Sequence, residues 1–212
     1  MDVLVAGGHG QIARRLLRLL AREGHTPRGL IRNPDHVADL ESDGAHPVLC
    51  DLEHDDLRPH VGGADAIVFA AGAGPGSGPE RKQTLDLGGA LKCIQAAQEL
   101  GVDRFLIVSS INTEQADTPG PMQAYFTAKR DADRAVEASG LAWTIVRPGA
   151  LTNDPGTGLV NVAPAGFGDV TRDDVAAVLY ECLLAENTVG VKFDLIGGDE
   201  PIVNAVRSLT RR

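Results

Sequence analysis

The sequence has few cysteines, few aromatic side chains and no long apolar run. Its only cysteines are Cys50, Cys93 and Cys182, which lie far apart and form no Cys-x-x-Cys pair. They predict neither a disulfide framework nor a zinc site, and the scattered histidines have no metal-ligand spacing. Aromatic residues make up 4% of the chain, which leaves little for stacking on nucleic-acid bases. We therefore expect no metal centre and no nucleic-acid partner.

Positive charge is also scarce, because 20 lysines and arginines stand against 29 aspartates and glutamates, giving a net charge of −9 at pH 7. Such a charge opposes nonspecific binding to nucleic acid and to anionic membranes. No apolar run approaches the length of a membrane span, and no secretory segment precedes the first apolar run. We expect a cytoplasmic protein with a small-molecule substrate and no membrane partner. Monomer and homodimer both stay open.

Short apolar runs alternate with helical patterns along the chain. Strands are expected at residues 3–6, 28–31, 47–50, 66–70, 104–109, 143–147 and 191–196. Helices are expected at residues 11–23, 35–43, 80–100, 121–139, 171–186 and 201–210. Most strands are continuously apolar, as in a parallel sheet covered on both faces. The predicted fold is α/β: a single Rossmann-like, doubly wound, mainly parallel sheet with helices on both faces, spanning residues 1–212, with small C-terminal elements on the substrate side.

The first strand breaks into a glycine turn that opens the first helix. Gly7 suits the positive φ of a tight turn, Gly10 leaves the backbone open to phosphates, and Ala13 lets the helix pack closely. His9 occupies the middle-glycine place of the more familiar GxGxxG pattern. This strand, turn and helix predict a dinucleotide whose pyrophosphate lies at the helix N-terminus.

The end of the second predicted strand favours NADP(H) over NAD(H). Arg32, followed by Asn33, stands where an NAD enzyme carries an acidic residue for the ribose hydroxyls. A guanidinium can instead pair with the 2′-phosphate of NADP, although an ordinary exposed arginine is the alternative. His9 could add a phosphate contact or be solvated. Asp51 and Leu52 could flank the adenine, or Asp51 could cap the next helix.

Two glycine- and proline-rich stretches interrupt the pattern. Residues 71–79 follow a strand and are expected to form a cofactor-side loop, with a flexible connector as the alternative. Residues 149–168 are also expected to be irregular and could form a substrate lid. Positions 73–80 and 151–168 would then shape the substrate pocket. By contrast, Thr171 is expected simply to cap the helix that follows it.

Tyr125 and Lys129 are four residues apart on a predicted helix and therefore share a face. A nearby ammonium favours phenolate and lowers the pKa of a tyrosine, which could then give a proton to a carbonyl oxygen as hydride arrives. Ser110, at the end of the fifth predicted strand, could hold that oxygen. The alternatives are a helix tyrosine with a solvated hydroxyl and a serine that merely caps a strand.

Taken in order, the motifs resemble the short-chain dehydrogenase/reductase superfamily, and closely its atypical, short, NADP-binding group of epimerase/dehydratase-like proteins. The matching segments run from residue 3 to about residue 176: VLVAGGHGQIA, LIRNP, VFAAGAGPG, TLDLGGALKCIQAA, RFLIVSS, YFTAK, WTIVRPGALTN and VTRDDVA.

The resemblance implies a role for each matching position. Residues implied to contact the pyrophosphate, the 2′-phosphate, the ribose or the nicotinamide are Gly7, Gly10, Gln11, Ile12, Arg32, Ala70, Ala71, Gly72, Lys129, Pro148, Gly149 and Ala150. Ser110, Tyr125 and Lys129 match the catalytic set, with Ser109 as the alternative serine. Asp86 stands where the wider superfamily has Asn and this group has Asp; on sequence alone it could be an ordinary helix residue.

These features predict an NADP(H)-dependent oxidoreductase that transfers hydride to a small carbonyl or conjugated substrate, with Tyr125 as proton donor. One alternative is a noncatalytic NADP(H)-binding redox sensor, because atypical members can lose catalysis. Another is an epimerase or dehydratase acting on a nucleotide-sugar-like substrate. The 212 residues leave no room for the larger sugar-binding domain of full-length epimerases, which argues against that reaction.

Overall fold

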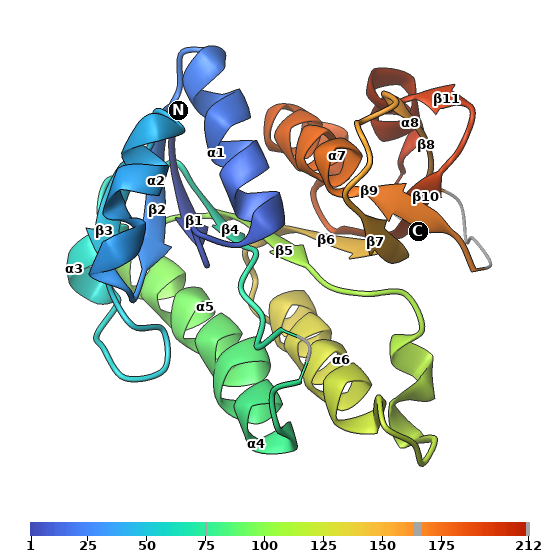
Figure 1. Cartoon of the computed structure of the whole chain (residues 1–212), viewed down its shortest axis with the longest axis horizontal. Helices are drawn as coiled ribbons and strands as arrows, with labels where there is room; N and C mark the ends of the chain where they lie inside the picture. Colours follow the sequence, from blue (N-terminus) through green and yellow to red (C-terminus); the bar gives the residue numbers. More distant parts are fainter. Residues whose placement is uncertain (75, 163–166, 211–212) are drawn as a thin grey trace.

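The computed structural model describes residues 1–74, 76–162 and 167–210. Within these ranges nine strands form one sheet, in the order β11 (Glu200–Pro201), β8 (Leu159–Asn161), β10 (Val191–Gly197), β6 (Ala142–Pro148), β5 (Arg104–Val108), β4 (Ala66–Phe69), β1 (Asp2–Ala6), β2 (Thr26–Ile31) and β3 (His46–Leu49) (Figure 1). Seven neighbouring strands run parallel: β3, β2, β1, β4, β5, β6 and β10. At the far edge, β8 pairs antiparallel with both β10 and β11. A second small sheet pairs β7 (Ala150–Thr152) with β9 (Asp169–Thr171).

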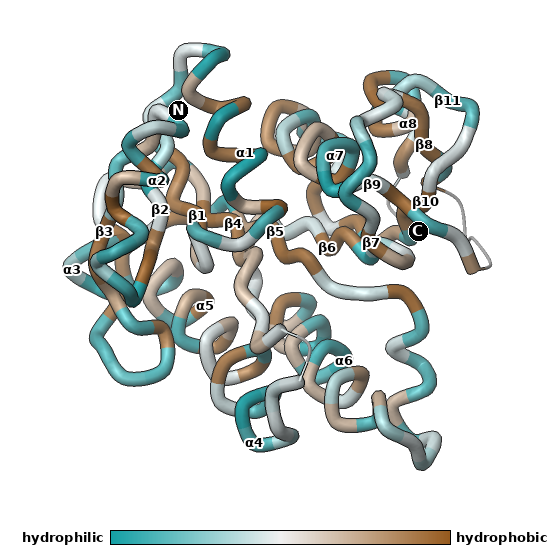
Figure 2. Tube along the Cα trace, viewed as in Figure 1, coloured by the Kyte–Doolittle hydropathy of each residue, from teal (hydrophilic) through white to brown (hydrophobic). Residues whose placement is uncertain are grey.

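Helices cover both faces of the large sheet (Figure 1). One face carries α1 (Gln11–Arg22), α2 (Val37–Ser42), α7 (Arg172–Leu184) and α8 (Ile202–Ser208). The other face carries α3 (Arg58–Val61), α5 (Gly88–Leu100) and α6 (Gln123–Ala138). The side chains of β1 alternate between the two cores: Val3 and Val5 face α1, whereas Leu4 and Ala6 face α5. Figure 2 shows the apolar strands enclosed between helices with hydrophilic outer faces.

The strand order reverses next to β1, which lies between β2 and β4. After β1 the chain moves outward to β2 and β3, and then returns to β4 on the other side. In an open parallel sheet, a reversal of this kind leaves a crevice at the carboxyl ends of the neighbouring strands, and ligands bind there. The glycine turn after β1 and the loop after β4 both open at this crevice.

The predicted doubly wound α/β fold is confirmed. Each of the seven predicted strands is present, with ends shifted by two residues at most. Thr171 caps α7 as expected, because its Oγ1 accepts a hydrogen bond from the Asp174 N–H at 3.0 Å. Over the described residues, no helix is both long and apolar enough to cross a bilayer.

Two expectations about regular structure are wrong in part. The helix expected at residues 80–100 is α4 (Pro79–Arg81), a π-helical turn at Lys82–Leu87 and then α5. The stretch 149–168, expected to be irregular, contains β7 and β8, because distant partners β9 and β10 supply their hydrogen bonds. Pro75 and residues 163–166, which fall within the predicted pocket segments, lie outside the described residues.

Candidate cofactor and active site

The turn between β1 and α1 is built by backbone contacts that exclude side chains. Gly7 has φ of +80°, and its carbonyl accepts the N–H of Gly10 at 2.8 Å. A Cβ on Gly7 would lie 2.6 Å from the Cα of Ala71, and one on Gly8 would lie 2.8 Å from the Cα of Gly29. Both positions therefore need glycine, because a side chain at either one would clash. Sequence analysis identified Gly7 as necessary but not Gly8.

The start of α1 is left open to an anion. Gly10 is the N-cap, no side chain caps this end, and the first turn holds no acidic residue. The N–H groups at a helix start carry partial positive charge and need acceptors. A pyrophosphate can supply those acceptors, as the sequence predicts.

A cavity of about 310 Å³ lies beside this turn and reaches the ends of β2 and β3. Its walls include these residues that sequence analysis placed near the cofactor: Gly7, His9, Gly10, Arg32, Asp51, Leu52, Ala70, Ala71 and Gly72. The size suits part of a dinucleotide, such as an adenosine moiety. Asn33 is not on this wall; its side chain accepts the Asp35 N–H at 3.0 Å and begins a 3-10 turn.

Two arginines meet one carboxylate in this cavity. Arg32 Nη1 lies 3.6 Å from Glu53 Oε2, and Arg81 Nε lies 3.2 Å from the same oxygen. The Thr84 hydroxyl donates to the other Glu53 oxygen at 2.6 Å. This hydrogen bond, followed by the Arg81 guanidinium, lowers the pKa of Glu53. Sequence reasoning missed Arg81 and Glu53, because only folding brings α4 beside the loop after β3.

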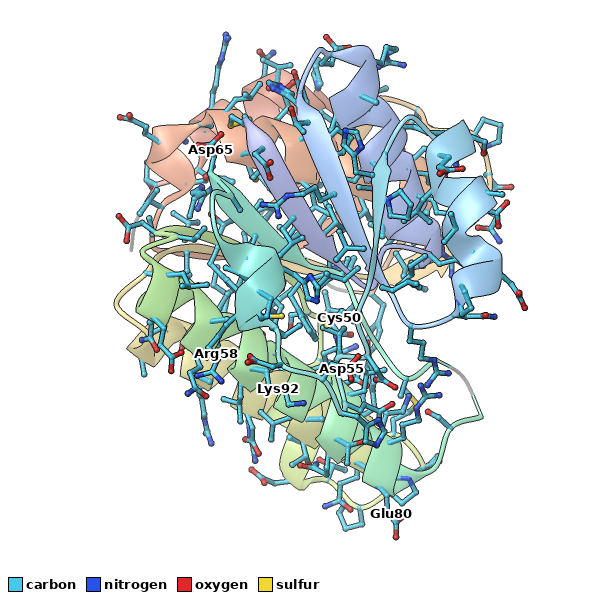
Figure 3. The ribbon with its side chains drawn as sticks, turned by 90° about the vertical axis from the view of Figure 1, so that its left-hand side faces the viewer. Cys50, Asp55, Arg58, Asp65, Glu80 and Lys92 are labelled. Atoms are coloured by element: carbon cyan, nitrogen blue, oxygen red, sulfur yellow. The ribbon has the colours of Figure 1, made fainter. Side chains whose placement is uncertain are left out.

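Hydrogen bonds from Lys92 on α5 hold the loop after β3 in place. Lys92 Nζ donates to the carbonyl oxygens of Glu53 at 2.8 Å and of Asp55 at 3.4 Å. Figure 3 shows Lys92 on α5 close to the loop segment that carries Asp55. Asp51 accepts the Glu53 N–H at 2.9 Å, so it shapes a turn and does not cap α3, which begins at Arg58. Burial raises the pKa of Asp51, but the hydrogen bonds from the Glu53 N–H and the His54 ring together outweigh burial, so the pKa lies below its usual value.

His9 is engaged by neighbouring side chains. Its Nε2 lies 2.7 Å from Asp39 Oδ2, and its ring stacks on His36 with 3.5 Å between the ring centres. This hydrogen bond lowers the pKa of Asp39. Of the two expectations for His9, a freely solvated ring is wrong, because α2 holds the imidazole at the cavity wall.

A second, larger cleft of about 1240 Å³ adjoins the first, since Ala70, Ala71 and Gly72 line both. Its walls bring together nine other candidate site residues from the sequence analysis: Gln11, Ile12, Asp86, Ser109, Ser110, Tyr125, Lys129, Gly149 and Ala150. Pro148 is buried at the end of β6 and is not among the lining residues. Gly149 is packed so tightly against the Gly168 carbonyl that a side chain would clash there.

Tyr125 and Lys129 share the face of α6 that lines this cleft. Lys129 Nζ lies 5.9 Å from the centre of the Tyr125 ring and donates to the Val108 carbonyl at 3.0 Å. Lys129 is only 5% exposed, so the β5 carbonyl holds its position within the protein. Lys82, from the π-helical turn, places a second ammonium 5.4 Å from the Tyr125 ring centre.

Asp86 contributes a buried oxygen that the protein leaves without a hydrogen bond. The residue is 1% exposed, and its Oδ2 accepts the Ala73 N–H at 2.8 Å. Its Oδ1 lies 3.7 Å from Lys129 Nζ and accepts no hydrogen bond from the described residues. A buried acceptor without a donor is costly, which favours a ligand that donates to it. This acceptor, the uncapped helix start and the side-chain-free glycine turn together fit a bound NAD(P)H.

The two serines after β5 have different surroundings. Both line the cleft, but Ser109 is buried and lies near Asp133, whereas Ser110 is half-buried. Burial raises the pKa of Asp133 to about 6, and the Ser109 hydroxyl and Lys129 ammonium oppose that rise. Asp133 lies one helical turn beyond Lys129; sequence reasoning gave it no role.

The fold and the site together define the class of protein. It is a Rossmann-type protein whose glycine turn and two adjoining clefts suit a dinucleotide. Residues 7–186 also match the sequence model of the NAD(P)H-binding family, and the chain belongs to that family. The predicted resemblance to the atypical short-chain dehydrogenase/reductase-like Rossmann proteins is thereby confirmed.

Some similar proteins of comparable length are named as oxidoreductases and others as epimerases. The chain is 39% identical to the uncharacterized sugar epimerase YhfK of Bacillus subtilis, over 99% of this chain and 100% of the relative. A solved candidate NAD-dependent epimerase/dehydratase from Bacillus halodurans is 40% identical, with a TM-score of 0.94 over 99% of this chain and 100% of that one. The oxidoreductase ylbE from Lactococcus lactis is 27% identical, with a TM-score of 0.88 over 99% and 96% of the two chains.

Proposed function

We propose that this protein is an NADP(H)-dependent oxidoreductase that reduces a small carbonyl or conjugated substrate. The observation that carries the proposal is one continuous pair of clefts. At one end two arginines adjoin the glycine turn, and at the other Ser110, Tyr125 and Lys129 share a wall with an unsatisfied Asp86.

The cofactor residues fall into three groups along the clefts. The start of α1, from Gly10 to Ile12, would hold the pyrophosphate. Arg32 and Arg81 would hold the 2′-phosphate of NADP, for which a guanidinium fork is well suited. Asp86 Oδ1 would accept a hydrogen bond from the nicotinamide end. Bound NADPH supplies a hydride for the reduction.

The catalytic groups then act on the substrate oxygen. Ser110 donates a hydrogen bond to that oxygen and orients the carbonyl. The Tyr125 hydroxyl gives its proton to the same oxygen, and the proton is replaced from solvent. The Lys129 ammonium, fixed by the Val108 carbonyl, stabilises the phenolate left on Tyr125.

The first test compares the parent protein with Tyr125→Phe. NADPH oxidation is followed by absorbance over a panel of aldehydes, ketones, quinones and enones. We expect the parent to reduce at least one class, and Tyr125→Phe to lose about 100-fold or more in kcat, a typical effect of one acid–base group. NADPH affinity should stay within twofold by calorimetry, because the phenol oxygen acts on substrate. Tyr180→Phe, the same change at the other tyrosine of the chain, on α7 and outside the walls of both clefts, is the matched control.

Turnover in Tyr125→Phe at the parent rate would contradict the assigned proton donor. A parent that binds NADPH but reduces no compound of the panel would instead favour the noncatalytic sensor. A second candidate reaction is epimerisation, which the name of the Bacillus subtilis relative supports. It would be indicated by NADP⁺ that stays bound through purification and is regenerated within each turnover.

A further inference from the structure

The larger cleft extends beyond the proposed catalytic groups into an apolar region. Its walls there include Ile111, Met122, Phe126, Leu151 and Phe167. The Phe167 ring is 83% exposed, in a chain with few aromatic residues. A cleft wall with several apolar side chains together suits an apolar ligand.

Arg172 stands on the wall of this same region. Its Nη1 donates to the Leu151 carbonyl at 3.2 Å and to Asn153 Oδ1 at 3.0 Å. These neutral acceptors hold the guanidinium in place but leave its charge uncompensated. Among the described residues, no carboxylate lies within the 4.0 Å of an ion pair with Arg172, whereas most other arginines of this acidic chain have such a partner.

The two acids that follow Arg172 in sequence are already engaged. Asp173 pairs with Arg15 Nε at 2.5 Å and accepts the Gly156 N–H at 3.2 Å. The Asp174 carboxylate accepts the N–H groups of Thr157 at 3.0 Å and Gly158 at 2.8 Å, and the Thr171 hydroxyl donates to it at 2.9 Å. Neither carboxylate is therefore available to neutralise the guanidinium.

The charged side chains lining the cleft give it the opposite sign to the whole molecule. They are three cations, Lys82, Lys129 and Arg172, and two carboxylates, Asp86 and Asp169. Asp86 is buried beside Lys129, and no ion pair joins Asp169 to Arg172. A site with a surplus of one positive charge, in a protein of net charge −9, attracts an anionic ligand.

We infer that Arg172 is the binding site for a substrate carboxylate, and that the substrate of this protein is an apolar, conjugated or aromatic carbonyl compound bearing that acid. The Nε and Nη2 of Arg172 donate to no partner among the described residues, and these two donors can pair with both oxygens of a carboxylate. The apolar walls take the rest of the molecule, and Tyr125 lines the same cleft for the carbonyl. The inference rests on the proposed reductase function, but its test separates the two.

The probes are 4-carboxybenzaldehyde and methyl 4-formylbenzoate, in which a methyl ester replaces the carboxylate and removes its charge. Binding of each is measured by calorimetry on protein loaded with NADP⁺, which cannot reduce them. We expect the acid to bind about tenfold more tightly than the ester, the order of one charge-assisted hydrogen bond near solvent. Arg172→Gln should remove this preference, and Arg172→Lys should restore part of it.

The matched control is Arg134→Gln, which removes an exposed arginine on α6 outside the cleft. It should keep the full preference for the acid. With NADPH in place of NADP⁺, the same preference should recur in the KM values of the parent.

Three results separate the possibilities. No preference for the acid in a parent that binds NADPH would overturn the carboxylate site and leave the reductase proposal intact. A loss of NADPH affinity above fivefold in Arg172→Gln would also overturn it, because Arg172 would then serve the cofactor. Absence of NADPH binding in the parent would overturn the proposed function itself.

Discussion

At the scale of single residues, the site is defined by how a few charges are paired. Arg32 and Arg81 both lie near Glu53, which gives the cavity an internal anion where we place the cofactor phosphate. The side chain of Arg32 is 55% exposed, so it can turn toward a ligand at little cost. Glu53 is held by Thr84 and is the fixed member of the group.

Arg32→Ala should therefore weaken NADPH binding and spare NADH. We expect a roughly tenfold rise in the dissociation constant for NADPH, since a charged hydrogen bond at an exposed site contributes about 1–1.5 kcal/mol. The value for NADH should change by less than twofold, because NADH lacks the 2′-phosphate. Calorimetry with both cofactors measures the difference, and Arg134→Ala provides the control. Equal effects on both cofactors would assign Arg32 to the shared part of the dinucleotide.

Sequence reasoning reached the residues of the site that lie in motifs and missed those that depend on tertiary contact. Tyr125 and Lys129 follow from helical spacing, and Arg32 follows from its place after a strand. Arg81, Asp133 and the half-buried cation Arg172 carry no such local pattern. Their significance comes from neighbours that are far away in sequence, such as Glu53, Ser109 and Leu151.

At the scale of elements, the glycine turn combines an unusual backbone conformation with close packing. Gly7 and Gly24 both have positive φ, at +80° and +78°. A Cβ on Gly7 would meet the backbone of Ala71, whereas one on Gly24 would have no atom within 4 Å. The two positions therefore separate backbone strain from steric overlap.

Gly7→Ala should destabilise the fold more than Gly24→Ala. Left-handed backbone at alanine costs about 1–2 kcal/mol at either site, and overpacking adds roughly 1–3 kcal/mol at Gly7 alone. Urea unfolding measures both free energies. Gly7→Ala should also lose NADPH affinity, while Gly24→Ala should keep it. Equal losses of stability would mean that Ala71 moves aside without cost.

Element prediction from sequence succeeded for long apolar strands and failed for short paired ones. The seven strands of the parallel region are apolar enough to be recognised locally. By contrast, β7, β8 and β9 have three residues each, too few to show a period. The π-helical turn was not predicted, because one extra residue within a single turn leaves the spacing of apolar residues on both sides typical of an α-helix.

At the scale of the whole molecule, folding buries one acid against its preference for water. Asp133 is 3% exposed, and burial raises its pKa to about 6. The folded protein therefore holds a proton that the unfolded chain releases near pH 3.9. Stability from this group is complete below pH 4 and is lost as the pH rises through 6.

Asp133→Asn should remove this dependence on pH. Relative to the parent, the free energy of unfolding of the variant should rise by about 3 kcal/mol between pH 4 and pH 8, from a shift of about two pKa units. Urea unfolding at the two pH values gives the comparison. Asp131→Asn, on the same helix but more exposed, should track the parent. A constant difference between Asp133→Asn and the parent would mean that Asp133 stays ionised throughout.

The wide turn at Lys82–Leu87 also affects how the site can change over time. A π-helical turn contains one residue more than a regular helical turn, and the buried Asp86 lies within it. Deleting a single codon there would let α4 and α5 merge into one continuous helix and rotate the carboxylate away from the crevice. A lineage could thus lose this acceptor by a change in length, without any substitution at Asp86.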